Sequence, residues 1–104
     1  MKRVAFRMHL HKGNEDEYIK RHNEIPRELT ELLKTAGISD YSIFLDDDTG
    51  NLFAVMTIES EEKLKQLAVH PEMKKWWTFM KDIMDTNPDH SPVSVHLKEV
   101  FNLK

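Results

Sequence analysis

Tyr18 and His22, two side chains able to hold or transfer a proton, lie four positions apart in a stretch with helical periodicity. Residues at that spacing share one face of a helix, so the phenol and the imidazole are expected to reach the same site. An imidazole donates or accepts a proton near neutral pH, and a phenol hydroxyl orients the imidazole or binds a substrate oxygen. The pair is equally compatible with a structural histidine that has one hydrogen-bond partner in the interior.

Trp76 and Trp77 form a second unusual pair. Adjacent indoles on a helix point in different directions, so one is expected in the core and the other against a pocket. An indole face suits the C–H side of a sugar ring, and the indole N–H suits a sugar hydroxyl. Packing of both indoles in the core is the alternative, because large aromatic side chains dominate core energetics.

Metal and nucleotide chemistry have little support in the sequence. His9 and His11 have a spacing that zinc sites use, but no third ligand and no helical H-E-x-x-H pattern accompany them. The segment 46–51 resembles a calcium loop only in composition, because Gly50 occupies a ligand position and no glutamate closes the loop. Cysteine is absent and no glycine-rich phosphate loop is present. We therefore expect no metal.

Composition limits the classes of protein further. A chain of 104 residues with 32% charged and 39% hydrophobic residues is expected to form one domain over 1–104. The net charge of −3 disfavours nucleic acid as a partner, and the strand expected at 52–58 lacks the basic, aromatic pattern of RNA-recognition modules. No long apolar run and no secretory signal pattern are present, so we expect no membrane partner and a cytoplasmic location.

Hydrophobic periodicity predicts the elements that must position these side chains. Asn14, with Glu17 three residues later, predicts a helix start, and Pro26 predicts a kink or break between His22 and Ile25. The expected elements are a strand over 4–10, a helix from 14 to before Gly37, strands over 41–45 and 52–58 joined by a turn, a short helix over 60–68, a helix over 71–84, a loop over 85–92, and a strand over 93–103 with a bulge near Val100.

This order predicts an α+β fold, the ferredoxin-like βαββαβ plait, with an antiparallel sheet and all helices on one sheet face. The strand at 52–58 is apolar on both sides, because Leu52 and Ala54 alternate with Phe53 and Val55. One helix layer covers only one face of a sheet. The second face is therefore expected to pack against another copy of the chain, as a twofold homodimer.

Several of these residues belong to a larger pattern, which resembles the L-rhamnose mutarotase family. The likeness runs from the first strand to Val100-Phe101, and the tryptophan pair and the N-P-D-x-S-P-V loop are its most specific parts. The residues that carry it are Glu17-Tyr18, Arg21-His22-Asn23, Glu28-Leu29, Asp40-Tyr41-Ser42-Ile43, Trp76-Trp77 and the loop from Asn87 to Val93.

The resemblance implies a dimeric, α/β-barrel-like assembly that interconverts the α and β anomers of the monosaccharide L-rhamnose without a cofactor. By matching positions it implies that His22 is the proton donor and that Tyr18, Tyr41, Trp76 and Trp77 bind the sugar. It identifies no general base.

The chain departs from the family pattern at one place, and two other functions remain open. Members often carry a tryptophan and then a proline between the positions of Ile25 and Glu28, where this chain has Pro26 and Arg27. The pocket wall is expected to differ there, which leaves the exact sugar preference open and does not affect Tyr18 and His22. The same fold class also hosts cofactor-free monooxygenases and haem-degrading enzymes, in which His22 or His70 would be a haem ligand or base. A non-catalytic sugar-sensing module is the other alternative.

Overall fold

The computed structural model describes all residues, 1–104, and contains four strands and four helices. In chain order these are β1 (Lys2–His9), α1 (Glu15–Asn23), α2 (Arg27–Thr35), β2 (Ile38–Leu45), β3 (Asn51–Ile58), α3 (Glu61–Ala68), α4 (Pro71–Met80) and β4 (Val95–Leu97).

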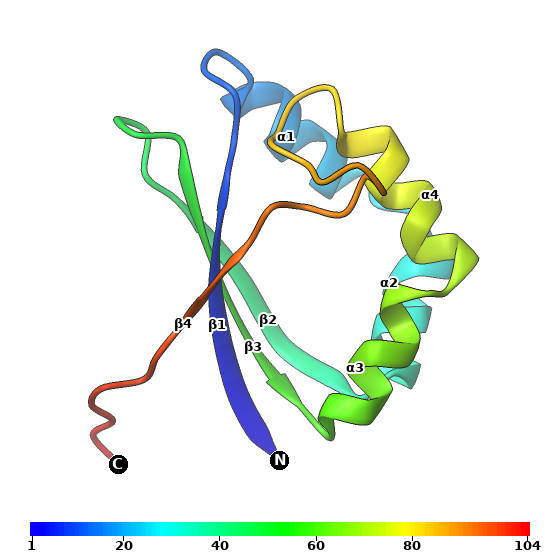
Figure 1. Cartoon of the computed structure of the whole chain (residues 1–104), viewed down its shortest axis with the longest axis vertical. Coiled ribbons are helices and arrows are strands. Elements are labelled where there is room, and N and C mark those ends of the chain that lie inside the picture. Colours follow the sequence, from blue (N-terminus) through cyan, green and yellow to red (C-terminus); the bar gives the residue numbers. More distant parts are fainter.

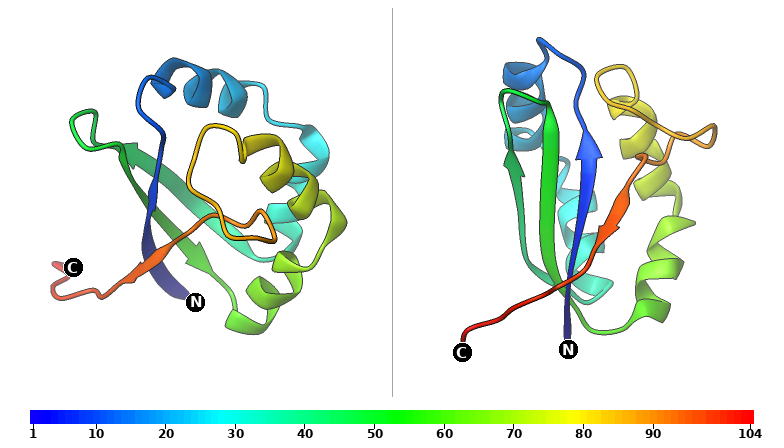
Figure 2. Two further views of the ribbon diagram at one scale, coloured as in Figure 1. Left: turned by 45° about the horizontal axis from the view of Figure 1, so that its top comes forward. Right: turned by 60° about the vertical axis from the view of Figure 1, so that its left-hand side comes forward.

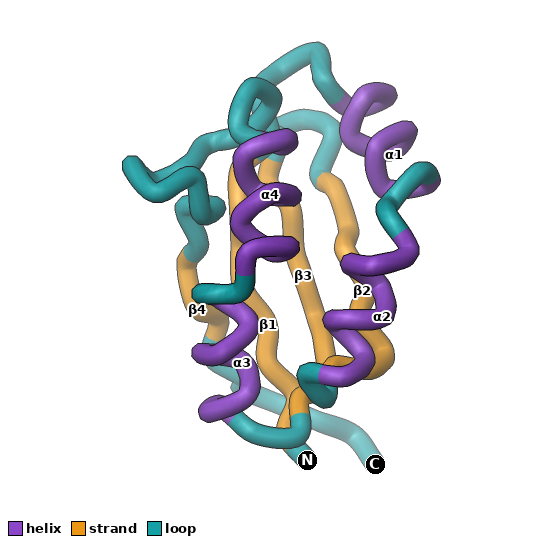
Figure 3. The backbone as a smooth tube through the Cα atoms, turned by 90° about the vertical axis from the view of Figure 1, so that its right-hand side faces the viewer, coloured by secondary structure: helices purple, strands orange, loops and turns teal.

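The strands form one antiparallel sheet in the order β2-β3-β1-β4, and all four helices lie on one face of it (Figure 1). Viewed from the helix side, α1 and α2 form one column, and α4 and α3 form a second column beside it (Figure 3). The expected ferredoxin-like α+β plait is confirmed. No helix combines the length and the apolar composition needed to cross a membrane.

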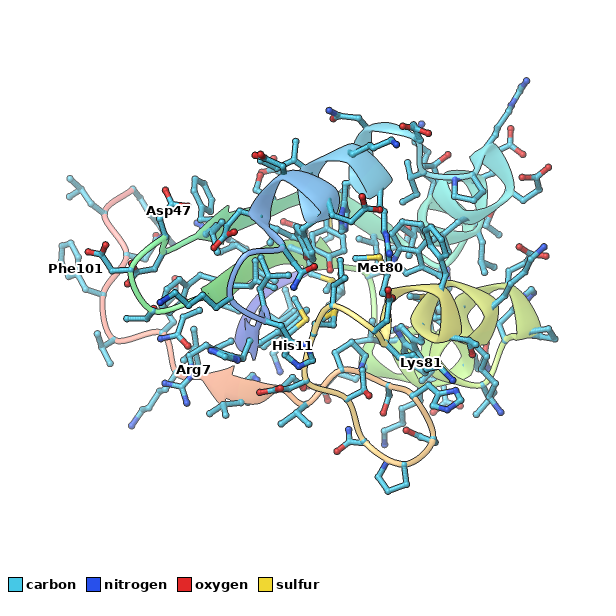
Figure 4. The ribbon with its side chains drawn as sticks, turned by 90° about the horizontal axis from the view of Figure 1, so that it is seen from above. Arg7, His11, Asp47, Met80, Lys81 and Phe101 are labelled. Atoms are coloured by element: carbon cyan, nitrogen blue, oxygen red, sulfur yellow. The ribbon has the colours of Figure 1, made fainter.

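Strand β3 shows why the helices cover this face. Its residues alternate strictly between buried and half-buried, and the buried set faces the helices. Burial of an aliphatic side chain contributes about 1.5–3 kcal/mol, so this alternation fixes which face is covered. The buried residues of the strand are Leu52, Ala54, Met56 and Ile58. Met80 of α4 points into the same interior, between the helices and the sheet (Figure 4).

The expected break in the first helical region is confirmed at Pro26. Helix α1 ends at Asn23, and α2 begins at Arg27 directly after Pro26, whose backbone is extended (φ −59°, ψ 138°). Proline is tolerated there because its missing N–H lies outside the intrahelical ladder. The expected side-chain cap by Asn14 is wrong: its amide instead donates to the carbonyl oxygens of His11 and Lys12.

A β-bulge in β2 determines where Tyr41 lies. The pairing with β3 shifts between Ser39 and Ser42, so that Asp40 and Tyr41 together face Met56. Asp40 has a left-handed backbone with φ 51°, which is the usual cost of an extra residue in a strand. The sequence alone suggested that this strand begins at Tyr41. In the structure it begins at Ile38.

The expected end of the helix over 71–84 is wrong. Helix α4 ends at Met80 and not at residue 84, because the chain turns back and pairs Leu10 with Met84. Ile83 and Met84 are buried in this turn, which explains the apolar pattern that suggested more helix.

The fourth strand contains only Val95–Leu97, and no strand or bulge exists near Val100. The tail after Leu97 runs out on the sheet face opposite the helices (Figures 1 and 2).

Candidate active site

The candidate residues line a cavity of about 60 Å³ between the helix layer and the sheet. Tyr18 and His22 come from α1, Trp76 and Trp77 from α4, and Tyr41 from the bulge of β2. His90, from the loop after α4, also borders this cavity, and sequence reasoning gave it no role. The fold therefore brings together all five side chains singled out in the sequence, while the roles expected for them stay predictions.

His22 has a defined orientation at the cavity. Its Nδ1 lies 3.0 Å from the backbone carbonyl oxygen of Tyr18, one helical turn earlier. A carbonyl oxygen only accepts, so Nδ1 must carry the hydrogen and donate it. The Tyr18 ring lies 4.3 Å from the imidazole between centroids, and the Trp76 ring meets it edge-on at 5.3 Å.

These contacts determine the protonation state of His22. Burial lowers the pKa of the imidazole below its usual value, and the Tyr18 carbonyl bond opposes this only in part. The neutral ring with hydrogen on Nδ1 has a lone pair on Nε2. In the resting protein, His22 therefore offers the cavity a proton acceptor.

The two tyrosines are neutral hydroxyl groups at physiological pH. Burial, with a smaller contribution from nearby Tyr41, raises the pKa of Tyr18 well above its usual value. Burial of the hydroxyl raises the pKa of Tyr41 to about 12, although 38% of that residue remains exposed. Phenols held in this state form hydrogen bonds readily and transfer protons poorly near pH 7.

The polar atoms of the aromatic side chains are available to a ligand. The hydroxyls of Tyr18 and Tyr41 and the indole N–H groups of Trp76 and Trp77 make no hydrogen bond within the chain. Every side-chain polar atom that is fully buried does have a hydrogen-bond partner. These groups therefore keep some access to solvent. Both indoles are half-buried and both border the cavity. Trp76 also packs against the hydrophobic core, so the expected division into one core and one pocket tryptophan holds only in part.

The cavity opens toward enough space for a small molecule. A cavity of 60 Å³ is well below the roughly 300–1,000 Å³ of typical small-molecule sites. A groove of about 540 Å³ adjoins it beneath α3 and α4, and Tyr41, Met73 and Trp77 border both spaces. A larger groove of about 620 Å³ on the outer side of α1 and α4 is lined mainly by charged side chains and contains neither His22 nor a tyrosine.

Arg21 joins the two helices that carry the site, a role that sequence reasoning missed. Its guanidinium binds Asp82 through two nitrogens at 2.8 and 3.1 Å, Glu17 at 2.7 Å and the Phe79 carbonyl at 2.7 Å. It also lies 4.4 Å from the centre of the Phe79 ring. The side chain is only 11% exposed. These contacts fix the end of α4 against α1, and the hydrogen bonds from Arg21 lower the pKa of Asp82.

The other histidines singled out in the sequence lie outside the cavity. His9 and His11 both hydrogen-bond Asp85, at 3.1 and 2.9 Å, and thereby tie the end of β1 to the segment after α4. No group of three or more potential metal ligands is present. His70 caps α4, because its Nδ1 accepts from the backbone N–H of Glu72.

Known proteins share both the sequence and the structure of this chain. The sequence model of a family described as L-rhamnose mutarotase matches residues 3–103. A protein of Clostridium beijerinckii named L-rhamnose mutarotase is 55% identical over 100 residues, covering 96% of each chain. One of the same name from Burkholderia cenocepacia is 50% identical over 104 residues, covering all of both chains.

Solved structures give the same result. The crystal structure of an L-rhamnose mutarotase from Formosa agariphila superimposes with a TM-score of 0.93 at 46% identity, over the whole of both chains. An antibiotic biosynthesis monooxygenase superimposes with a TM-score of 0.64 at 11% identity, covering 96% of this chain and 99% of that one. This second likeness concerns the fold alone.

Proposed function

The chain belongs to the L-rhamnose mutarotase family, and we propose that His22 is the side chain through which it exchanges the anomers of its sugar. Family membership makes the protein an isomerase that interconverts α- and β-L-rhamnopyranose. The residues and the steps that perform this reaction are the content of the proposal.

Anomer exchange requires two proton transfers. One group removes the proton of the anomeric hydroxyl as the bond between C1 and the ring oxygen breaks, and the ring oxygen gains a proton. Rotation about C1–C2 then presents the other face of the aldehyde, and the reverse transfers close the ring. No covalent bond to the protein and no change of oxidation state are needed.

The geometry of His22 supports its part in both halves. Neutral Nε2 takes up the anomeric proton during ring opening, while the Nδ1 contact with the Tyr18 carbonyl, at 3.0 Å, holds the ring in place. The imidazolium formed then returns this proton to the carbonyl oxygen during ring closure. The proton-donor role that the family resemblance implies for His22 belongs to this closing half.

The aromatic walls provide the sugar site. We assign the apolar ring face and the C6 methyl group to Trp76 and Trp77, and the sugar hydroxyls to the free hydroxyls of Tyr18 and Tyr41. Burial of one methyl group is worth about 1 kcal/mol, so 6-deoxy sugars are favoured. Acid and base groups supplied by the chain itself support a reaction without a cofactor.

The observation that carries the proposal is a half-buried imidazole with a free Nε2 at a cavity lined by unpartnered tyrosine and tryptophan groups. The test is anomer exchange of L-rhamnose, measured by saturation transfer between the anomeric protons in NMR. We expect His22→Ala to fold normally and to lose about 10²–10⁴-fold in rate, the usual contribution of one positioned proton-transfer group.

His70→Asn is the matched control, because asparagine also caps a helix and His70 lies outside the cavity. We expect this variant to keep the wild-type rate. Wild-type exchange in His22→Ala would rule out the proposed role. A panel of L-rhamnose, L-fucose, D-ribose and D-galactose then defines the sugar range, including any effect of Pro26 and Arg27.

We also propose that two copies pair through the open face of the sheet. Phe44 and Val95 lie on this face and are 63% and 46% exposed. The tail that runs out on the same side exposes Val100, Phe101 and Leu103 (Figures 1 and 4). Apolar patches of this kind usually mark an interface.

Light scattering after size exclusion tests the pairing. We expect a dimer for the wild type at micromolar concentration and a monomer for Phe44→Glu, because a charge buried in an apolar interface destabilises it. A monomeric wild type would contradict the pairing. The proposed location is the cytoplasm, which suits a small chain that uses none of the disulfides common in small secreted domains.

A further inference from the structure

We propose that Thr86 is a further sugar-binding residue of the site, and that Asp85 is the residue that positions it. The Thr86 hydroxyl binds a ring hydroxyl of the sugar that the two tyrosines leave without a partner. The inference rests on the proposed function, because it adds a contact to the sugar site defined by His22. Neither residue is among those that carry the family resemblance, which resume only at Asn87.

Thr86 borders the cavity from the side opposite the two tyrosines. Tyr18 and Tyr41 come from α1 and β2, which lie together at one side of the molecule (Figure 3). The segment after α4 lies at the other side, where Met84 pairs with the residue that follows β1. Besides the anomeric hydroxyl, L-rhamnopyranose has hydroxyls at C2, C3 and C4, spread around the ring. Two tyrosines on one side therefore leave part of the sugar without a hydrogen-bond partner.

The Thr86 hydroxyl is free to make this contact. The side chain is half-buried, and its hydroxyl makes no hydrogen bond within the chain. A threonine hydroxyl both donates and accepts, so it pairs with a sugar hydroxyl in either direction. His90, the other polar side chain that this segment brings to the cavity, already has its Nδ1 3.2 Å from the Thr78 hydroxyl. Thr86 is therefore the uncommitted polar group on this side of the cavity.

Backbone pairing fixes the chain on both sides of Thr86. The preceding residue, Asp85, donates its N–H to the His9 carbonyl oxygen at 3.0 Å, and its own carbonyl oxygen accepts from the Val93 N–H at 3.1 Å. Thr86 itself forms a bridge with Pro92. The segment is thus held to the end of β1 on one side and to the returning chain on the other. Because threonine is branched at Cβ, its side chain also has few rotamers.

The Asp85 carboxylate adds a second connection to the sheet. Its two oxygens are hydrogen-bonded to ring nitrogens of His9 and His11, at 3.1 and 2.9 Å. The three side chains are 43–49% exposed, so these bonds contribute little to the free energy of unfolding. Their effect is on position, because a hydrogen bond to the sugar weakens outside a narrow range of distance and angle. Asp85 is therefore a positioning residue, which acts on the sugar through Thr86.

The experiment measures kcat and KM for anomer exchange of L-rhamnose in Thr86→Val, Thr86→Ser and the wild type. Valine keeps nearly the shape of threonine and removes the hydroxyl, whereas serine keeps the hydroxyl. We expect KM to rise about fivefold in Thr86→Val, the usual effect of one lost neutral hydrogen bond, with kcat nearly unchanged. Thr86→Ser is expected to stay within about twofold of the wild-type KM.

The matched control is Thr35→Val, the same change at an exposed position near the end of α2 that does not border the cavity. We expect it to match the wild type in both constants. Circular dichroism verifies that each variant is folded, and Thr86→Ala removes the same hydroxyl should Thr86→Val fold poorly.

Deoxy analogues of L-rhamnose identify the hydroxyl that Thr86 binds. The 2-, 3- and 4-deoxy sugars each lack one ring hydroxyl and keep the anomeric centre. For the analogue that lacks the partner of Thr86, the wild type and Thr86→Val are expected to give the same KM. The other two analogues keep the difference of about fivefold. A difference that persists for all three would indicate packing instead of a hydrogen bond and would overturn the assignment.

Asp85→Ala tests the positioning role in a double-mutant cycle. We expect it to raise KM about threefold in the wild-type background and to add nothing in Thr86→Val, because its effect passes through the Thr86 hydroxyl. Asp85→Asn keeps an oxygen and an amide that hydrogen-bond the two imidazoles, so it is expected to restore most of the wild-type KM. Additive increases in KM would overturn the role of Asp85.

Wild-type KM in folded Thr86→Val would overturn the sugar contact, as would an equal rise in Thr86→Ser. Failure of the underlying proposal is separate. In that case His22→Ala, measured in parallel, keeps the wild-type rate whatever the Thr86 variants do.

Discussion

The contact network of Arg21 gives the sharpest prediction about how the site is held together. Arg21→Gln removes the bonds to Asp82, Glu17 and the Phe79 carbonyl at once. The two carboxylates are 62% and 43% exposed, so each regains water and its loss costs only about 0.5 kcal/mol. The Phe79 carbonyl and the stacking on its ring add about 1 kcal/mol. We expect a total destabilisation of about 2 kcal/mol.

The assay is thermal unfolding followed by circular dichroism. For a domain of this size, about 2 kcal/mol corresponds to a decrease in Tm of about 10 °C. The matched control is Arg27→Gln. This variant removes the ion pair between Arg27 and Glu31, which are also one helical turn apart, and in this pair the Arg27 side chain is 87% exposed. This pair contributes about 0.3–0.5 kcal/mol, so its loss lowers Tm by about 2 °C.

Equal decreases in Tm for the two variants would refute the reasoning, because the difference depends on the low exposure of Arg21 and its contacts with α4. Activity provides a second measurement on the same proteins. At 25 °C, where both remain folded, Arg21→Gln is expected to slow anomer exchange about tenfold, because α1 carries Tyr18 and His22 of the site and α4 carries Trp76 and Trp77. Arg27→Gln is expected to match the wild type.

Two further predictions concern the backbone and pH. In urea unfolding, Gly50→Ala is expected to destabilise the protein more than Gly13→Ala does. Both glycines have left-handed backbones, so both substitutions carry that strain. A Cβ at Gly50 also meets the Leu10 carbonyl oxygen at 2.7 Å, whereas a Cβ at Gly13 meets nothing within 4 Å. Similar losses would show that the backbone near Leu10 shifts easily. The free energy of unfolding of the wild type falls as pH drops below about 6.5, the usual pKa of histidine, because unfolded His22 binds a proton before folded His22 does. The loss continues down to the lowered pKa, and His22→Gln shows a smaller decrease over this range; an unchanged pH dependence would contradict the burial effect.

Local patterns were sufficient to predict most of the architecture. The strict alternation in β3 determined which face the helices cover, and Pro26 determined where the first helical region breaks, because both effects act over a few residues. The same reasoning failed at Ile83 and Met84. Their apolar spacing is helical, but they are buried because the chain turns back onto Leu10, a contact between residues 74 positions apart.

The site was predictable only in part, for the same reason. Tyr18 and His22 share a helix face, so their proximity follows from spacing alone. Tyr41 reaches the cavity through a bulge at Asp40, which the pattern of the strand does not show. Arg21 and His90 depend on partners in distant elements, Asp82 and Thr78. The loop containing His90 was noticed for its likeness to the family, but its place at the cavity that His22 also borders emerged only from the fold.

The most direct test of the account is a crystal structure of the protein with L-rhamnose bound. The account predicts the sugar in contact with Trp76 and Trp77 at the cavity, with Nε2 of His22 about 2.6–3.2 Å from the anomeric oxygen. It would be contradicted by a sugar seated elsewhere, for example in the outer groove beside Glu17, with the imidazole of His22 beyond reach of the hemiacetal.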